Sequence, residues 1–216
     1  MEEFDALRGL AAASVFLNHA LNLPPERITN RFLWVLGAGD AAVGLFFVLS
    51  GFVLGRSRIH RNSTYAEFVI RRCFRIYPAY LVGIALAGLL MWGHAPAGLS
   101  DLANWPAHVW DHPVPLDQMF RYVGLIGLGL DTSFISPIWS LQVEMRVSLV
   151  FPLLLAIMTF PLPYVGLLLI AASTLLGIVF DPPTVRAVPL FLLGIAIATN
   201  EERFRALQPP RFSVGS

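Results

Sequence analysis

Apolar residues occur along this chain in six long runs, separated by polar or proline-containing stretches. A membrane-spanning helix needs about 20 mainly apolar residues, with a range of about 17–25. The runs have about this length, although the second and the sixth are short. The pattern predicts an all-α fold, a polytopic transmembrane helical bundle with about six spanning helices at 5–23, 40–56, 77–94, 137–158, 162–180 and 184–199.

A weaker apolar stretch, 119–130, contains Arg121 and several glycines, and we interpret it as interfacial or re-entrant. Proline pairs lie between the runs, where helices end or turn. No internal repeat is visible. We therefore predict one membrane domain, residues 1–200, followed by a short cytoplasmic tail, 201–216.

Composition excludes an ordinary soluble domain. Apolar residues make up 56% of the chain and charged residues 13%, whereas soluble domains have about 45–50% and about 25%. The net charge of +1 and the lack of a basic strip with interleaved aromatic residues give no sign of nucleic-acid binding. Cys73 is the single cysteine, so an intramolecular disulfide is excluded, and no motif predicts a metal site. The acidic N-terminus does not resemble a secretory signal, so we expect the first apolar run to stay as a membrane anchor.

Arginine supplies every positive side chain, and its distribution predicts the orientation in the membrane. The segment 93–118 contains no Lys or Arg. The loop expected between the second and third helices carries six arginines, Arg56, Arg58, Arg61, Arg71, Arg72 and Arg75. Because cytoplasmic loops are enriched in Lys and Arg, this loop and both termini are predicted to be cytoplasmic, and 93–118 exoplasmic.

The first predicted helix carries two ionisable residues on one face. Arg8 and His19 are eleven residues apart, which is about three turns and about 16 Å along the helix axis. Ionisable residues inside a span usually face the bundle interior or a cavity. A histidine there can act as a general base. The alternatives are that Arg8 is a snorkelling anchor and that His19 is an interfacial residue in contact with water.

The fourth predicted helix carries Glu144 and Arg146. Residues two apart do not face each other on a helix, so each needs a partner on another helix or a cavity. The topology places Glu144 and His19 in the outer half of the membrane, where contact between them would orient the imidazole. The alternative is that Glu144 and Arg146 only neutralise other buried charges.

Arg71, Arg72 and Arg75 are expected at the cytoplasmic start of the third helix. Arg71 and Arg75 are four residues apart and share a face. Guanidinium groups bind phosphates bidentately, so this cluster suits a polyanion such as a nucleotide. The alternative is that it serves only as the topology signal.

Together these motifs resemble acyltransferase family 3, a family of bacterial integral-membrane O-acyltransferases. The resemblance is carried in the family's order by FDALRGLAA at 4–12 running to His19, FFVLSGF at 46–52, RRCFRIYP at 71–78 and WSL at 139–141 with Glu144 and Pro152, with a weaker echo in FLLG at 191–194. Where the family often has an acidic residue before the paired phenylalanines, this chain has Gly44 and Leu45, with Asp40 upstream.

The resemblance implies transfer of an acyl group, often acetyl, from acyl-CoA to a hydroxyl of a sugar, surface glycan or lipid-linked glycan in the bacterial inner membrane. No bound cofactor is implied; the partners are the acyl-CoA donor, the carbohydrate acceptor and membrane lipid. His19 and Glu144 would be catalytic. The substrate-binding residues would be Arg8, Arg71, Arg72, Arg75 and Trp139.

Two other interpretations stay open. Family members usually have more spanning helices than six, so this chain resembles a C-terminally short member and would be inactive if essential helices are missing. Ionisable residues within spans also suit a proton-coupled transporter. Transfer of acetyl from acetyl-CoA, as opposed to movement of a solute without it, distinguishes these interpretations.

Overall fold

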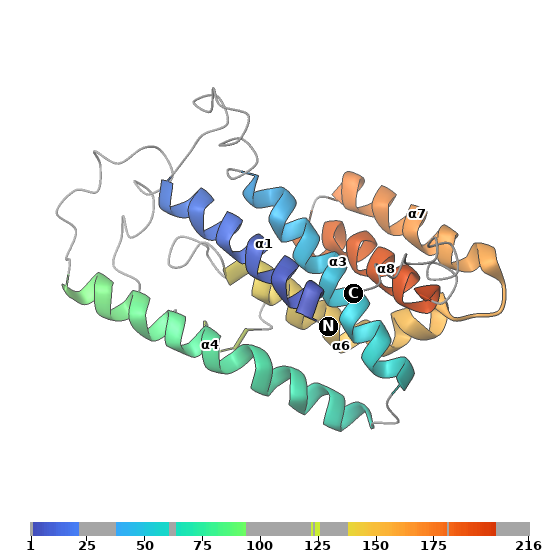
Figure 1. Ribbon diagram of the computed structural model, residues 1–216, viewed down its shortest axis with the longest axis horizontal. Helices are drawn as coiled ribbons and strands as arrows, with labels where there is room; N and C mark the ends of the chain where they lie inside the picture. The colour runs from blue at the N-terminus through green and yellow to red at the C-terminus, as the bar shows by residue number, and fades with distance from the viewer. Residues whose placement is uncertain are drawn as a thin grey trace, which may run out of the picture.

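The computed structural model describes residues 2–21, 38–60, 64–93, 122, 124–125, 138–180 and 182–201. Six helices form this part of the chain, and it contains no strand (Figure 1). They are α1 (Glu2–Leu21), α3 (Gly39–His60), α4 (Tyr65–Gly93), α6 (Ile138–Met158), α7 (Pro163–Phe180) and α8 (Pro183–Thr199). The predicted all-α fold and its six helices are confirmed.

Helix α4 begins twelve residues earlier than predicted, at Tyr65 and not at 77. Thr64 and Glu67 form a capping box: the Glu67 N–H donates to Thr64 Oγ1 over 3.3 Å, and the Thr64 N–H donates to Glu67 Oε2 over 3.2 Å. This reciprocal pairing satisfies two backbone donors at the start of a helix. The prediction was wrong because the charged residues before Tyr77 were taken as a loop, whereas they lie inside the helix.

The prolines that separate the last runs are found at helix starts. Helix α7 begins at Pro163 and α8 at Pro183. Proline suits the first helical turn because its missing N–H would have no partner there. Pro78, Pro152 and Pro189 lie within α4, α6 and α8, which membrane helices tolerate when neighbours satisfy the freed backbone groups.

The closest packing in the bundle is between α3 and α8, which run side by side (Figure 1). A side chain on Gly51 would collide with the Phe191 carbonyl, and one on Gly194 with the Val48 carbonyl. Small residues let membrane helices approach at backbone distance. This crossing is flanked by stacked Phe47 and Phe191, whose ring centroids are 5.3 Å apart.

Two antiparallel helix pairs set the positions of α1 and α4 along the axis of the bundle. Tyr65 near the start of α4 donates a hydrogen bond to the Leu149 carbonyl of α6, and further along α4 Ile84 packs in one cluster with Ile138 at the start of α6. In the other pair, Phe4 of α1 stacks on Phe52 of α3 at 4.7 Å, and Asn18 lies against Gly39. Helices α1 and α4 therefore both run opposite to their partners.

Three helices in the described part of the chain are long and apolar enough to cross a membrane, at Gly39–Ser57, Tyr65–Leu90 and Ile138–Met158. Shorter apolar helices cover Tyr164–Phe180 and Pro183–Thr199. Large apolar side chains on α4 and α7 point outward, as lipid-facing residues do; they include Phe74, Leu89, Leu167, Ile178 and Phe180. The protein is thus an all-α membrane protein, and the count of six spans stays a prediction.

Two predictions concern segments of which little is described. Within 119–130, the structure describes Tyr122, Gly124 and Leu125; Tyr122 and Leu125 are fully buried against α4 and α6. The interfacial or re-entrant course of that stretch lies outside the described residues. The tail beyond Glu201 also lies outside the described residues. Glu201 is described, and its carboxylate pairs with Arg56 over 3.3 Å.

Candidate active site

A buried ion pair joins α4 to α6. Arg72 Nη2 of α4 donates to Glu144 Oε1 of α6 over 2.7 Å, and the two side chains are 6% and 18% exposed. Ser50 Oγ of α3 donates to the same carboxylate oxygen over 3.3 Å, and Arg72 Nε donates to Ser148 Oγ over 3.1 Å. We call these four residues the Glu144 cluster. It connects all three of the long apolar helices that the structure describes.

The Glu144 cluster is built so that both charges are held in one geometry. Ser148 Oγ donates over 2.6 Å to the backbone carbonyl of Glu144, one turn before it on α6. The hydroxyl can therefore offer its lone pairs to Arg72. Removing one partner of such a pair leaves an uncompensated buried charge, which costs about 3–5 kcal/mol.

The prediction that Glu144 and Arg146 pair with other helices is confirmed. Arg146 Nη1 donates to Thr184 Oγ1 of α8 over 3.0 Å, and its Nη2 lies 3.4 Å from Gln142 Oε1 one turn earlier on α6. Glu144 turns instead toward α3 and α4. The two charges of α6 thus tie it to different neighbours.

The arginines of α4 have different environments. Arg72 is buried, whereas Arg71 and Arg75 are exposed. Position 72 belongs to a buried series with four-residue spacing, Phe68, Arg72, Ile76, Tyr80 and Ile84. That spacing was visible in the sequence and could have separated Arg72 from its neighbours. The surface available to an anion therefore centres on Arg71 and Arg75, with the charge of Arg75 acting on Arg72 through space.

Helix α1 brings Arg8, and not His19, to the level of the Glu144 cluster. Because Phe4 stacks on Phe52 in the antiparallel pair, Ser50 lies between the levels of Phe4 and Arg8. The charge of Arg8 also acts on Arg72. His19 follows Asn18, which lies against Gly39, so it is about 16 Å further along the bundle at about 1.5 Å per residue.

The described partners of Glu144 are consequently Arg72 and Ser50. The contact expected between Glu144 and His19 is not found, although the structure describes both residues, because they lie at levels about 16 Å apart along the bundle. Ser50 was not among the predicted site residues, because no base lies near it in the sequence; its partner is 94 positions away. Only the packing of α3 on α6 reveals the pairing.

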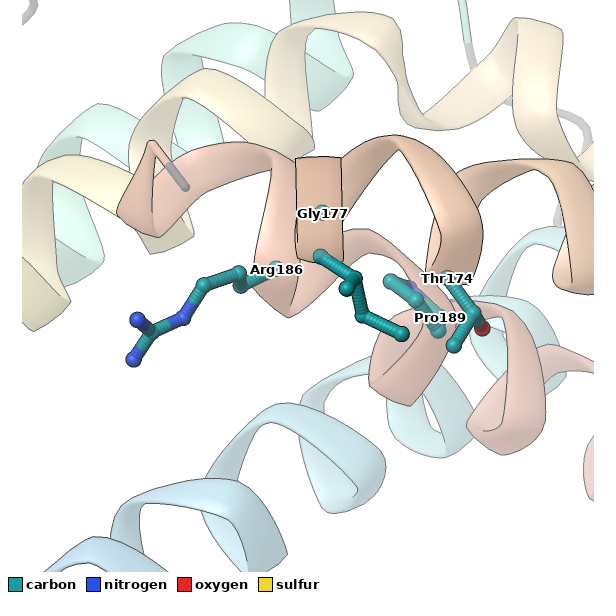
Figure 2. A pocket seen from close by; sticks show the side chains of 5 residues that line it. Thr174, Gly177, Arg186 and Pro189 are labelled. Carbon is teal, nitrogen blue, oxygen red and sulfur yellow. The ribbon is translucent and has the colours of Figure 1, made fainter. Parts of the chain in front are cut away.

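Trp139 lies at the end of the bundle where α3, α6 and α8 begin. Its ring meets Phe47 edge to face, with centroids 6.2 Å apart. It lines a cavity of about 330 Å³ between these three helices. A second cavity of about 330 Å³ lies between α7 and α8 and shares Arg186 with the first; Figure 2 shows Thr174, Pro189 and Arg186 lining it, with the end of the Arg186 side chain pointing away from the other two. No group of three metal-ligating residues occurs among the described residues.

The helical fold and the Glu144 cluster define an integral membrane protein with an ionic centre inside its spanning helices. A family model described as an acyltransferase domain matches residues 1–216. The chain belongs to this acyltransferase family, as its motifs predicted.

Several curated proteins are similar to this chain in sequence. Over 150 residues the chain is 33% identical to acyltransferase MdmB of Streptomyces mycarofaciens, covering 68% of the chain and 37% of that protein. Nodulation protein 10 of Rhizobium leguminosarum bv. viciae is 31% identical over 166 residues, 71% of the chain and 44% of that protein. An O-acetyl transferase of Shigella phage Sf6 is 37% identical over 78 residues, covering 35% and 22%. The chain spans less than half the length of these relatives, and no solved structure matches it.

Proposed function

We propose that this protein is a membrane O-acyltransferase, which moves an acyl group, acetyl in the simplest case, from acyl-CoA to a hydroxyl of a sugar, surface glycan or lipid-linked glycan. The Glu144 cluster is the observation that carries the proposal. Charges within spanning helices are costly and mark functional sites. This one lies in an acyltransferase-family chain, at the level of Arg8.

In the proposed reaction, His19 is the general base. It accepts the proton of the acceptor hydroxyl while the hydroxyl oxygen attacks the thioester carbonyl carbon. The C–O bond forms and the C–S bond breaks; the coenzyme A thiolate then leaves and takes the proton back from His19. Arg8 lies on the same face of α1 about 16 Å from His19, so it is suited to hold the donor along the route to His19 and not to contact the reacting carbonyl.

The donor is proposed to meet α4. Arg71 and Arg75 are exposed and share one helix face, so both guanidinium groups can bind the phosphates of acyl-CoA. Arg72 contributes differently, because Glu144 holds it inside the bundle. The Glu144 carboxylate neutralises its charge and fixes its position, so the unneutralised charges described near this level are those of Arg75 and Arg71.

The antiparallel helices support a separation of the two substrates. Arg71 and Arg75 lie at the level of the Glu144 cluster, whereas His19 lies about 16 Å further along the bundle. Trp139 lies five residues before Glu144, toward the same end as His19. With the N-terminus in the cytoplasm of a bacterial cell, the donor would approach from inside and the acceptor from the exoplasmic side of the inner membrane.

The test measures transfer of radiolabelled acetyl from acetyl-CoA in bacterial membranes that contain the chain. We expect transfer by the parent protein and its loss in His19→Ala, with expression matched by immunoblot. Thr174→Ala, in the cavity between α7 and α8, is the control and should keep the parent rate. Parent-level transfer by His19→Ala would exclude His19 as the base. Solute uptake without any acetyl transfer would favour a transporter.

A further inference from the structure

The cavity beside Trp139 combines the chemistry that a sugar requires. It measures about 330 Å³ and is lined mainly by apolar groups of α3, α6 and α8. Two ionisable residues also line it, Asp40 of α3 and Arg186 of α8. Ligand sites are typically such concave, mostly apolar cavities of about 300–1,000 Å³ with a few polar groups that fix orientation.

Asp40 is available to a ligand. It is an exposed residue in the first turn of α3, and it makes no hydrogen bond or ion pair with another described residue. Below it, Gly44 leaves the wall open: a side chain there would meet only the end of Leu190, at 3.7 Å. The carboxylate is therefore at the rim of a space that Gly44 keeps free.

Trp139 gives the cavity an aromatic wall. Its ring is partly buried and is held edge-on by Phe47. The apolar faces of a pyranose ring pack on such a wall, while its hydroxyl groups are bound by charged groups. Arg186 donates hydrogen bonds and Asp40 accepts them, so the pair suits a neutral polyhydroxylated ligand better than an anion or a cation.

The cavity also lies near His19, the proposed base, because α1 and α3 meet at this end of the bundle. Asp40 follows Gly39, and Gly39 is so near Asn18 that an added side chain would lie 2.8 Å from the Asn18 amide carbon. His19 is the next residue of α1 after Asn18. A ligand in the cavity would consequently lie at the same end of the bundle as His19.

We propose that this cavity is the acceptor subsite, in which Trp139 packs on a saccharide ring and Asp40 and Arg186 bind its hydroxyl groups. The assignment of an acceptor rests on the proposed acyl transfer, whereas saccharide binding itself does not. Asp40 and Arg186 thus determine which acceptor is bound, and neither takes part in the proton transfer.

The binding test uses the purified chain in lipid nanodiscs, because glucoside and maltoside detergents would compete for a saccharide cavity. An equimolar mixture of the methyl glycosides of glucose, galactose, mannose and N-acetylglucosamine is titrated while tryptophan fluorescence is recorded. We expect a saturable change that Trp139→Phe removes. Asp40→Asn should weaken binding about tenfold, the effect of losing one hydrogen bond to a charged group. Thr174→Ala is the control and should bind as the parent does.

Parent affinity in Asp40→Asn, or no saturable change in the parent protein, would overturn the cavity assignment. Acetyl transfer to the same mixture separates this assignment from the proposed function. If Asp40→Asn raises the KM for the glycosides about tenfold and leaves kcat and the KM for acetyl-CoA unchanged, both proposals are supported. A raised KM for acetyl-CoA would show that the cavity binds the donor. Saccharide binding without transfer by the parent would refute the acyltransferase activity and leave the saccharide site in place.

Discussion

The Glu144 cluster makes a quantitative prediction about stability. Arg72→Met removes the guanidinium and leaves the Glu144 carboxylate, 18% exposed, with the Ser50 hydroxyl as its remaining described partner. Breaking a buried pair by removing one partner costs about 3–5 kcal/mol. Replacing both charges by apolar residues of similar volume is often neutral or stabilising. We therefore expect Arg72→Met and Glu144→Leu each to destabilise the protein strongly, and the double variant to recover most of the loss.

A second ion pair in the same chain is the matched control. Arg56 and Glu201 are 3.3 Å apart; the carboxylates of the two pairs are similarly exposed, 20% and 18%, whereas the Arg56 side chain is 30% exposed and that of Arg72 6%. Pairs that water reaches contribute about 0.2–1 kcal/mol, and Arg56 is the partner that water reaches here. Arg56→Met should therefore change the free energy of unfolding by no more than about 1 kcal/mol.

The assay is reversible unfolding by sodium dodecyl sulfate in mixed micelles, followed by circular dichroism. Four proteins form the double-mutant cycle: parent, both single variants and the double variant. The coupling energy between positions 72 and 144 isolates the pair from unrelated packing effects. If Arg72→Met loses no more stability than Arg56→Met, the cluster is not a desolvated ion pair and the burial argument is wrong. If the double variant is stable and has lost acetyl transfer, the pair serves function and not folding.

Three further predictions test the packing, the helix start and the donor surface. Gly194→Ala should lower the free energy of unfolding by about 1–3 kcal/mol or more in the same assay, because the added methyl group would collide with the Val48 carbonyl of α3. Gly83→Ala, with nothing within 4 Å, is its control and should be neutral or stabilising. Thr64→Ala removes half of the capping box and should cost about 0.5–2 kcal/mol, with faster amide hydrogen exchange in the first turn of α4. Arg71→Gln and Arg75→Gln should raise the KM for acetyl-CoA and weaken its salt dependence without loss of folded protein; an unchanged KM in both variants would contradict donor binding on this face.

The sequence predicted the helices well because their pattern is local. An apolar run of the right length can be recognised without knowing which other helices it contacts. Pro163 and Pro183 begin α7 and α8, and proline is common at the first position of a helix. The start of α4 was missed although its signal was also local. Thr64 and Glu67 have the spacing of a capping box, but the arginines that follow them led to the assignment of this segment as a loop.

The partners of the ionisable residues could not be predicted in the same way. Periodicity shows that Glu144 and Arg146 cannot pair with each other, and the structure confirms it. Which residue each one meets depends on the rotation and level of whole helices. Arg72 and Glu144 are 72 positions apart, and Ser50 and Glu144 are 94 apart. Such contacts depend on tertiary packing that no short sequence window contains.

The positions of the charges change the interpretation of the Arg8–His19 face. Both residues lie on one side of α1, but only Arg8 is level with the Glu144 cluster; His19 is at the end of the bundle where Asn18 meets Gly39. Glu144 is therefore suited to hold Arg72 and α4 in place beside the donor, and His19 to meet an acceptor beside Trp139. The face of α1 then connects two sites with separate roles, about 16 Å apart along the axis. A donor whose phosphates bind at the level of Arg8 must therefore extend along this face, so that its thioester reaches the hydroxyl bound beside His19.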